Sequence, residues 1–307
     1  MKQALSNYWS IFRNYGLSNA IYSFYLYYFR EYKLKKIDIS KEHTVKTHGC
    51  KLLVIPNDVG ISSELLIFGS HEPIGIKFVS SKLKKGMICL DVGSNIGYYA
   101  TLESKMVGSD GKVIAIEPSP LNFKYLKHNL ELQNKSNFIA HNLACGDKDG
   151  KIDFLIFKNK SNYCQVLQSN ESVPEDTEIV SVPLKKIDSI IQDLDISNLD
   201  LLRMDIEGYD WHAIEGAKQT IHKFKPMIKI EIHYSVIGPM KTKQLFDFFK
   251  SEGYDKVFLI SEKRDPVSKS KTKAGIISIS YNELLSKLEK DELPLTLSLF
   301  LERSKNE

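Results

Sequence analysis

The chain has 307 residues, of which 42% are hydrophobic and 26% are charged, and its formal net charge is +4 at pH 7. These values are typical of a globular protein and exclude a wholly disordered, collagenous or long coiled-coil chain. So small a charge, without a basic run interleaved with aromatic residues, predicts no nucleic-acid partner. No stretch reaches the roughly 18 consecutive apolar residues of a transmembrane span. The four cysteines form no CxxC pair and no zinc spacing, so we expect reduced thiols and a cytoplasmic location.

The N-terminal arm, residues 1–48, is predicted to be helical and to precede a main domain at 49–307. Residues 21–29 are dense in aromatic side chains, and Arg30, Lys33 and two further lysines follow them. One interpretation, which we expect to hold, is a helix that packs on the main domain with its aromatics in the core. The alternative is an interfacial helix that makes a peripheral membrane contact, with the lysines on anionic lipid.

Alternating strands and helices begin at residue 87. Short apolar strands are predicted at 87–92, 112–116, 137–142, 199–204, 226–232, 256–260 and 295–302. Helices are predicted between them at 95–106, 120–132, 211–221 and 241–252, with Ser119 as the N-cap of the helix at 120–132. The region between 142 and 199 has no regular pattern. This alternation predicts an α/β fold with a doubly wound, mostly parallel sheet covered on both faces. The core of the main domain is predicted at residues 85–262. Residues 263–307 are predicted to hold a C-terminal loop, mobile at 264–273, and the last strand.

A glycine-rich turn follows the first predicted strand, with the sequence Asp91-Val92-Gly93-Ser94-Asn95-Ile96-Gly97. Glycines there let the backbone approach a ligand closely. Asp91 repels a pyrophosphate but attracts a cation. Glu117 closes the next strand, 117 − 97 = 20 residues later, where dinucleotide folds place the acid that binds ribose hydroxyls. The two acids favour S-adenosylmethionine, a nucleoside with an ammonium and a sulfonium, over a nicotinamide dinucleotide.

Five blocks in this order make the chain resemble the FkbM-type S-adenosylmethionine-dependent methyltransferases over about residues 50–262. The blocks are Gly69–Pro73, Asp91–Tyr99, Ile116–Pro118, Asn142–Asp147 and Met204–Gly208 with Glu215–Ala217. The resemblance implies a class I methyltransferase (Rossmann-like) fold, with a seven-stranded sheet that has one antiparallel strand near its C-terminal edge. It also implies O-methylation of a hydroxyl on a sugar, a glycolipid or a related natural product.

The resemblance assigns cofactor contacts residue by residue. It places the glycine turn around the methionine end, an acid on the ribose, and two residues after the third strand beside the adenine. These cofactor-binding residues are Asp91, Gly93, Ser94, Asn95 and Gly97 in the turn, Glu117 with Pro118, and Asn142 and Ala144. Glu72 and Asp205 are further candidates for the cofactor side.

The acceptor hydroxyl must lose a proton during attack, so a base or a cation is expected beside it. Two predicted strands end in acids at the edge where ligands bind: Asp205 and Glu207 follow one, and Glu231 and His233 close the next. We predict all four as catalytic residues, with His233 as the general base because its ordinary pKa lies near neutrality. No metal is expected, although Asp205 and Glu231 could instead hold Mg²⁺.

Two other functions remain as alternatives. A nicotinamide-dependent oxidoreductase would need a catalytic Tyr/Lys or Cys pair, and none is recognisable. A non-catalytic methyltransferase-like binding protein would be expected to have a damaged glycine turn, but Gly93 and Gly97 are both present. The expected substrate-facing loops, 158–182 and 234–242, identify no acceptor, and the oligomeric state stays open.

Overall fold

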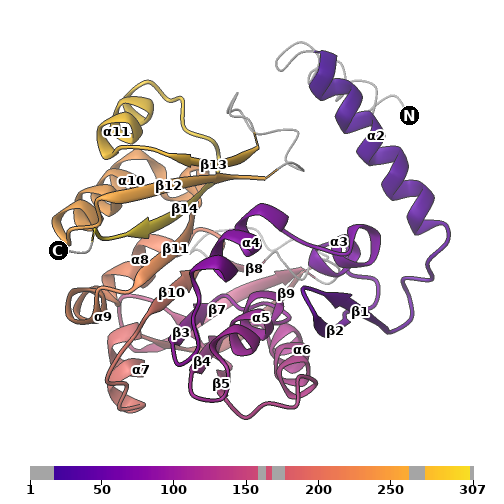
Figure 1. Ribbon diagram of the computed structural model, residues 1–307, viewed down its shortest axis with the longest axis horizontal. Coiled ribbons are helices and arrows are strands. Elements are labelled where there is room, and N and C mark those ends of the chain that lie inside the picture. The colour runs from indigo at the N-terminus through magenta and orange to yellow at the C-terminus, as the bar shows by residue number, and fades with distance from the viewer. Residues whose placement is uncertain (1–16, 158–163, 168–176, 263–273, 305–307) are drawn as a thin grey trace.

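The computed structural model describes residues 17–157, 164–167, 177–262 and 274–304. The predicted mobile loop at 264–273 lies outside these residues, as does most of the substrate-facing loop at 158–182. A central sheet with helices on both faces forms the body of the molecule, and one long helix stands to its side (Figure 1).

The central sheet has eight strands, in the order β13-β12-β14-β11-β10-β3-β4-β5. In chain order they are β3 (Ile88–Val92), β4 (Lys112–Ile116), β5 (Phe138–His141), β10 (Leu201–Met204), β11 (Met227–Ile232), β12 (Lys256–Ser261), β13 (Gly275–Ser278) and β14 (Leu297–Glu302). Strands β11, β10, β3, β4 and β5 pair in parallel, whereas β14 runs antiparallel between β11 and β12. The predicted α/β class and an antiparallel strand near the C-terminal edge are therefore confirmed. The predicted counts of seven strands and of one antiparallel strand are each too low by one, because β13 adds an antiparallel strand at the edge of β12.

Each face of the sheet is apolar, because side chains of a strand alternate between faces and both faces are buried. Cys89 and Val113 pack toward one group of helices, and Leu90 and Ile114 pack toward the other. On the first face lie α3 (Ile61–Phe68), α4 (Pro73–Lys82), α5 (Tyr98–Val107) and α6 (Pro120–Glu131). On the second lie α7 (Ile187–Asp193), α8 (Asp210–Glu215), α9 (Lys218–Phe224), α10 (Tyr234–Ser251) and α11 (Tyr281–Glu289). The chain thus crosses over on both faces, as doubly wound folds do.

Two predicted helix boundaries need correction. The single helix expected at 211–221 is two helices, α8 and α9, which meet at Gly216. A side chain at Gly216 would stand 1.9 Å from the carbonyl oxygen of Gly146, so this glycine permits close contact between two chain segments. Helix α10 starts seven residues earlier than expected and is kinked at Gly238, whose φ is 75°. The predicted cap of α6 is confirmed, because the hydroxyl of Ser119 accepts a hydrogen bond from the backbone N–H of Asn122.

A second sheet occupies most of the region that was expected to be irregular. Its strands, in the order β6-β9-β7-β8, are β6 (Ala144–Cys145), β7 (Gly150–Phe157), β8 (Cys164–Val166) and β9 (Thr177–Lys185). A small core that includes Phe154, Val182 and Leu184 holds it together. The sequence pattern missed this sheet because β9 is mostly exposed and contains Pro183, so its apolar positions do not stand out.

The N-terminal arm contains a helix, α2 (Leu17–Leu34), that stands beside the main body (Figure 1). It reaches that body at α3, where the ring of Phe29 stacks on Phe68 with 5.7 Å between centroids. The expectation that its aromatics form part of the core is wrong, because Tyr25 and Tyr28 are more than half exposed. Within the described residues, no helix is both long and apolar enough to cross a membrane.

A hairpin follows the arm, formed by β1 (His43–Thr47) and β2 (Cys50–Val54). The two-residue turn between them, His48-Gly49, has positive φ at both positions, which is the backbone of a type I′ turn. The division of the chain into an arm at 1–48 and a domain at 49–307 stays a prediction.

Candidate cofactor and acceptor pocket

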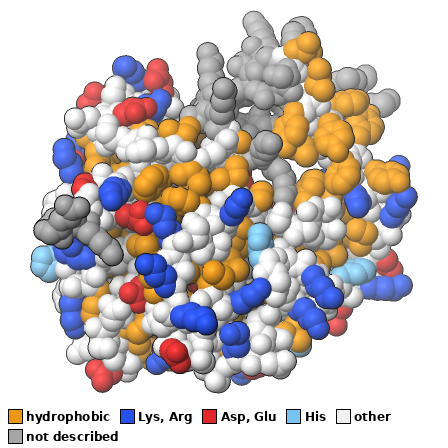
Figure 2. Space-filling model, viewed as in Figure 1, with side chains coloured by type: hydrophobic (Ala, Val, Ile, Leu, Met, Phe, Trp, Pro, Cys, Tyr) orange, Lys and Arg blue, Asp and Glu red, His pale blue; other side chains and the backbone are white. Residues whose placement is uncertain are grey.

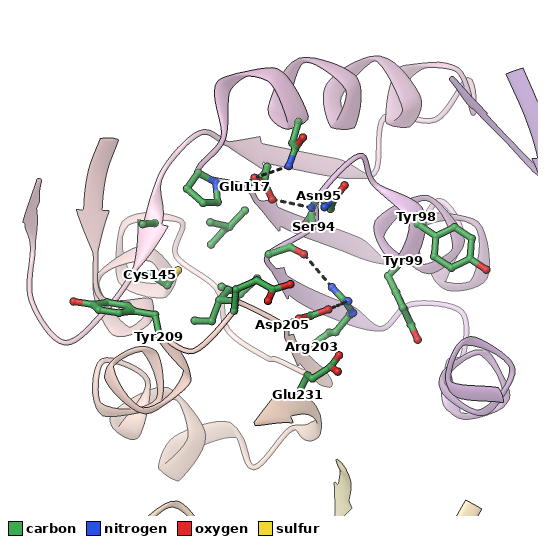
Figure 3. Close-up of a pocket in the computed structure, with 18 of the residues that line it drawn as sticks. Ser94, Asn95, Tyr98, Tyr99, Glu117, Cys145, Arg203, Asp205, Tyr209 and Glu231 are labelled. Atoms are coloured by element: carbon green, nitrogen blue, oxygen red, sulfur yellow. Dashed lines mark hydrogen bonds and ion pairs between the residues drawn. The ribbon is translucent and has the colours of Figure 1, made fainter. Parts of the chain in front are cut away.

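A pocket lies beyond the carboxyl ends of β3, β4, β10 and β11, where open α/β sheets bind ligands (Figure 3). Residues from α3, the loop before α4, the start of α5 and the second sheet complete its wall. The polar residues that line it include His71, Glu72, Ser94, Asn95, Tyr99, Glu117, Asn122, Arg203, Asp205, Glu207, Tyr209, Glu231 and His233.

The glycine turn forms one wall of this pocket, and hydrogen bonds to other parts of the chain hold its backbone in place. Gly93 and Ser94 both donate their N–H groups to the carbonyl of Ile116, each at 2.9 Å. The φ of Gly93 is 80°, and a Cβ at this position would lie 1.9 Å from the carbonyl oxygen of Asp205. Only glycine therefore allows the ends of β3 and β10 to approach this closely.

Glu117 is the best-anchored carboxylate in the pocket. Its oxygens accept hydrogen bonds from the backbone N–H of Asn95 at 2.8 Å and of Ser119 at 2.9 Å, and from the side chain of Asn122. Its exposed fraction is only 4%, and burial raises the pKa of Glu117 to about 7 against these hydrogen bonds. The carboxylate is thus fixed in place and titrates near neutral pH.

An apolar wall lies next to Glu117, formed by Pro118, Leu143, Ala144, Cys145 and Phe154. Such a wall suits the flat face of a heteroaromatic base. The amide of Asn142 donates to the carbonyls of Glu117 and Pro118, at 2.8 and 2.9 Å.

Arg203, in the middle of β10, holds two acids together beneath the pocket. Its guanidinium donates to Asp91 at 2.8 Å and to Asp205 at 2.9 Å, and it stacks 4.1 Å from the ring centroid of Tyr99. Asp91 is completely buried and Arg203 is 5% exposed. Burial disfavours the charge on Arg203, but Asp91 and Asp205 outweigh it and keep its pKa well above the ordinary value.

A second buried cation, Lys229 on β11, lies among the acids of the acceptor side. Its ammonium is fully buried, 3.6 Å from Glu72 and 3.8 Å from Glu231. Tyr99 donates its hydroxyl, at 2.7 Å, to the Glu72 oxygen that lies nearest to Lys229. Burial and the nearby charge of Asp205 raise the pKa of Glu231 to about 8, and Lys229 only partly offsets them.

The ring of His233 is held between two carboxylates. Its Nδ1 lies 3.2 Å from Asp210, which also accepts the backbone N–H of His233 at 3.0 Å, and its Nε2 lies 3.4 Å from Glu207. Burial disfavours a charged ring, but these hydrogen bonds outweigh it and raise the pKa of His233 well above neutrality. A ring that keeps both protons accepts no further proton, so this raised pKa argues against His233 as the general base, and that assignment stays a prediction.

Comparison with known proteins agrees with this geometry. The family described as the methyltransferase FkbM domain matches residues 91–256, more than half of the chain. The chain belongs to this family. Because that match covers the glycine turn and the two strand ends with their acids, the FkbM domain contains most of the pocket described above.

Individual relatives are more distant. "Methyltransferase 1" of Beauveria bassiana is 25% identical over 142 residues, which are 41% of this chain and 57% of that protein. The solved structure of methyltransferase FkbM from Methylobacillus flagellatus has 14% identity and a TM-score of 0.43, over 78% of this chain and 52% of the other. An rRNA methylase from Streptococcus thermophilus has 7% identity and a TM-score of 0.39, over 75% and 95%. The chain thus spans a little over half the length of the first two.

The predicted site residues fall into two groups. Those that line the pocket together are Glu72, Gly93, Ser94, Asn95, Glu117, Pro118, Ala144, Asp205, Glu207, Glu231 and His233. Three others lie behind its wall, and their direct cofactor contact stays a prediction. Asp91 is buried on Arg203, Gly97 caps α5 against Leu126, and Asn142 fixes the loop after β4.

Sequence reasoning missed several members of the pocket, above all Arg203, Lys229 and Tyr99. A signal was present for two of them, because Arg203 is the single charge of β10 and Lys229 lies between isoleucines in β11, whose one other charge is Glu231. A buried charge needs a buried partner, so such residues point to acids nearby. Asp210 carried no assigned role, and it anchors His233.

Proposed function

We propose that this protein transfers the methyl group of S-adenosylmethionine to a hydroxyl oxygen of a sugar, a glycolipid or a related natural product. The observation that carries the proposal is the pairing of Glu117 with a separate group of four carboxylates in one pocket: Glu72, Asp205, Glu207 and Glu231. Carboxylates accept hydrogen bonds from hydroxyl groups, and one of them can take the proton that an alcohol must lose. Membership of the FkbM family supports the methyltransferase part.

The pocket residues fit the methyl donor. Glu117 would accept hydrogen bonds from the ribose hydroxyls, and the wall around Ala144 and Phe154 would cover the adenine. Glu72 and Asp205 would face the ammonium and the sulfonium, because the negative charges of the two carboxylates complement these positive charges.

The same pocket fits a nicotinamide dinucleotide poorly. A pyrophosphate needs free backbone N–H groups at the glycine turn. Here the N–H groups of residues 93–97 all donate within the protein: two to Ile116, one to Glu117, one to the side chain of Asn95 and one to Ser94. This arrangement favours the methyl donor over the oxidoreductase alternative.

Glu231 is the proposed general base in place of His233. When bound, S-adenosylmethionine supplies a methyl group already activated by its sulfonium, so the protein's work is alignment and proton removal. The carboxylate of Glu231 takes the acceptor proton. Its pKa of about 8 makes it a stronger base than an ordinary carboxylate. His233, cationic and held by Glu207 and Asp210, positions Glu207 at the rim.

Mg²⁺ at Asp205 and Glu231 is the alternative source of activation. Ligand atoms of Glu72, Asp205 and Glu231 lie within 4.8 Å of one another, as do those of Asp205, Glu207 and His233. Lys229 already brings a positive charge to the first group, which reduces its need for a cation. We therefore propose a metal-independent reaction. Activity that is lost with a chelator and restored by Mg²⁺ would reject this part alone.

The test of the function has two stages. Calorimetric titration with S-adenosylmethionine and with NAD should show binding of the first only. Incubation with isotopically labelled methyl donor and a host glycolipid or polysaccharide extract should then transfer label to a product that resists mild base, as an ether does. Binding without transfer to any fraction would support the non-catalytic alternative, and label in RNA or protein would reject the acceptor class.

A further inference from the structure

One side of α2 is a stripe of exposed apolar and aromatic side chains. Each of these side chains has between 48% and 61% of its surface exposed, and their spacing places them on one face of a helix. They are Leu17, Ile21, Phe24, Tyr25, Tyr28 and Tyr32. Figure 2 shows a patch of hydrophobic side chains over this part of the molecule. An amphipathic helix ordinarily turns such a face toward the core, so its outward direction needs another explanation.

The other side of α2 already makes the contact with the main body. Phe29 stacks on Phe68 of α3, and Leu26 is partly buried. The stripe is therefore not a core face that has failed to dock. It is a second apolar face on the same helix.

The arm also accounts for the net positive charge of the protein. Residues 1–36 contain six Lys or Arg and one acid, a net charge of +5. Because the chain totals +4, residues 37–307 carry −1. Part of this charge lies beside the aromatics: the ammonium of Lys33 stands 5.5 Å from the ring centroid of Phe29, and that of Lys36 stands 4.2 Å from Tyr32.

We propose that α2 binds the surface of an anionic membrane, with the stripe at the boundary between headgroups and acyl chains and the lysines on lipid charges. Tyrosine suits this depth, because its ring is apolar and its hydroxyl reaches water. The charge favours lipid over a second copy of the chain, since two arms of +5 repel each other whereas anionic lipid attracts one. The proposal does not depend on the proposed reaction.

Sedimentation of the full chain with vesicles tests it. We expect the protein to sediment with mixed phosphatidylcholine–phosphatidylglycerol vesicles, to bind pure phosphatidylcholine vesicles far less, and to be released by high salt, which shortens the range of the lysine attraction. The triple variant Ile21→Ser, Tyr25→Ser, Tyr28→Ser should bind on the order of 100-fold more weakly, because three buried apolar contacts are lost. The triple variant Lys33→Gln, Lys35→Gln, Lys36→Gln should bind at least about tenfold more weakly.

A matched control replaces three equally exposed apolar residues on the main domain. The variant Leu121→Ser, Ile179→Ser, Leu295→Ser removes side chains that are 46%, 48% and 50% exposed, and its vesicle affinity should be unchanged. Titration with S-adenosylmethionine and thermal unfolding show that each variant is folded.

Three results would overturn the proposal. The first is no sedimentation with anionic vesicles at low salt. The second is a dimer in light scattering that the stripe variant dissociates while the native chain ignores vesicles, which would identify a second copy as the occupant. The third is a melting temperature lowered by several degrees in the stripe variant without vesicle binding by the native chain, which would show that the stripe is covered within the same chain.

Discussion

Two carboxylates at opposite ends of the pocket, Glu117 and Glu231, both have a raised pKa, but different kinds of partner hold them (Figure 3). Glu117 accepts two backbone N–H groups, which are neutral and fixed by the chain. Glu231 faces charged side chains, with Asp205 raising its pKa and Lys229 lowering it. Fixed neutral donors suit a group that binds a ligand in one orientation. Burial together with a balance of nearby charges suits a group that gains and loses a proton in each turnover.

The largest expected effect is on the acceptor end. Glu231→Gln keeps the shape of the side chain but cannot take a proton, so the methyl-transfer rate should fall about 10²–10⁴-fold while the donor Kd stays within a factor of about two. The wild-type rate should rise with pH as Glu231 loses its proton near pH 8, and the variant should lose this dependence. Single-turnover assays with labelled donor measure both. The surface variant Glu215→Gln is the control, and a Glu231→Gln enzyme that keeps half its rate would reject the assignment.

The next effect is on the buried cation beneath the pocket. Arg203→Met leaves Asp91 buried without its partner, and loss of one member of a buried ion pair costs about 3–5 kcal/mol. We expect the free energy of unfolding, measured with urea, to fall by this amount. Lys243→Met breaks an exposed pair with Asp247 and should cost less than about 1 kcal/mol. Equal losses in the two variants would show that the Arg203 cluster does not stabilise the fold in this way.

At the cofactor end the expected effect is smaller. Glu117→Gln removes the charge from the proposed ribose contact and should weaken S-adenosylmethionine binding by about 1–3 kcal/mol. Calorimetry on the folded variant measures this, with Glu131→Gln on the exposed side of α6 as the control. Unchanged affinity would place the ribose elsewhere in the pocket.

The smallest expected effect is the change of cofactor affinity with pH, which depends on Glu117 and not on Glu231. In the proposed complex the ionised form of Glu117 would accept hydrogen bonds from the ribose hydroxyls, and the pKa of Glu117 in the free protein is about 7. Affinity for the donor should therefore be nearly constant above pH 8 and should fall as pH drops through 7, by on the order of tenfold at pH 6. Glu117→Gln should bind with the same affinity at both pH values. A wild-type protein with equal affinity at pH 6 and 8 would contradict the raised pKa.

Prediction from the sequence succeeded where neighbours in the chain decide the structure. The strand at 112–116 and the Ser119 cap both follow from local residue types. Prediction failed where contacts between distant residues decide. The second sheet needs β6 to pair with β9 some 40 residues later, and the role of Asp91 depends on Arg203, 112 residues away.

The orientation of the N-terminal helix and the protonation of the site also depend on contacts between distant residues. The composition of the arm predicted a helix over the aromatic run, and α2 covers this run. Which face of that helix meets α3 was not readable, because both faces carry aromatic residues. The choice of His233 as base used its ordinary pKa, but Asp210 and Glu207 change that pKa.

The sequence alone determined the alternation of strands and helices that builds most of the central sheet, the glycine turn, and which acids stand at strand ends, since these depend on residue type and spacing along the chain. Only the tertiary structure decided which acids meet a cation, which face the pocket, and which can release or accept a proton near neutral pH. The physical reason is that a pKa depends on burial and on charges within a few ångströms, and in this pocket those charges come from β10, β11 and the loop before α4.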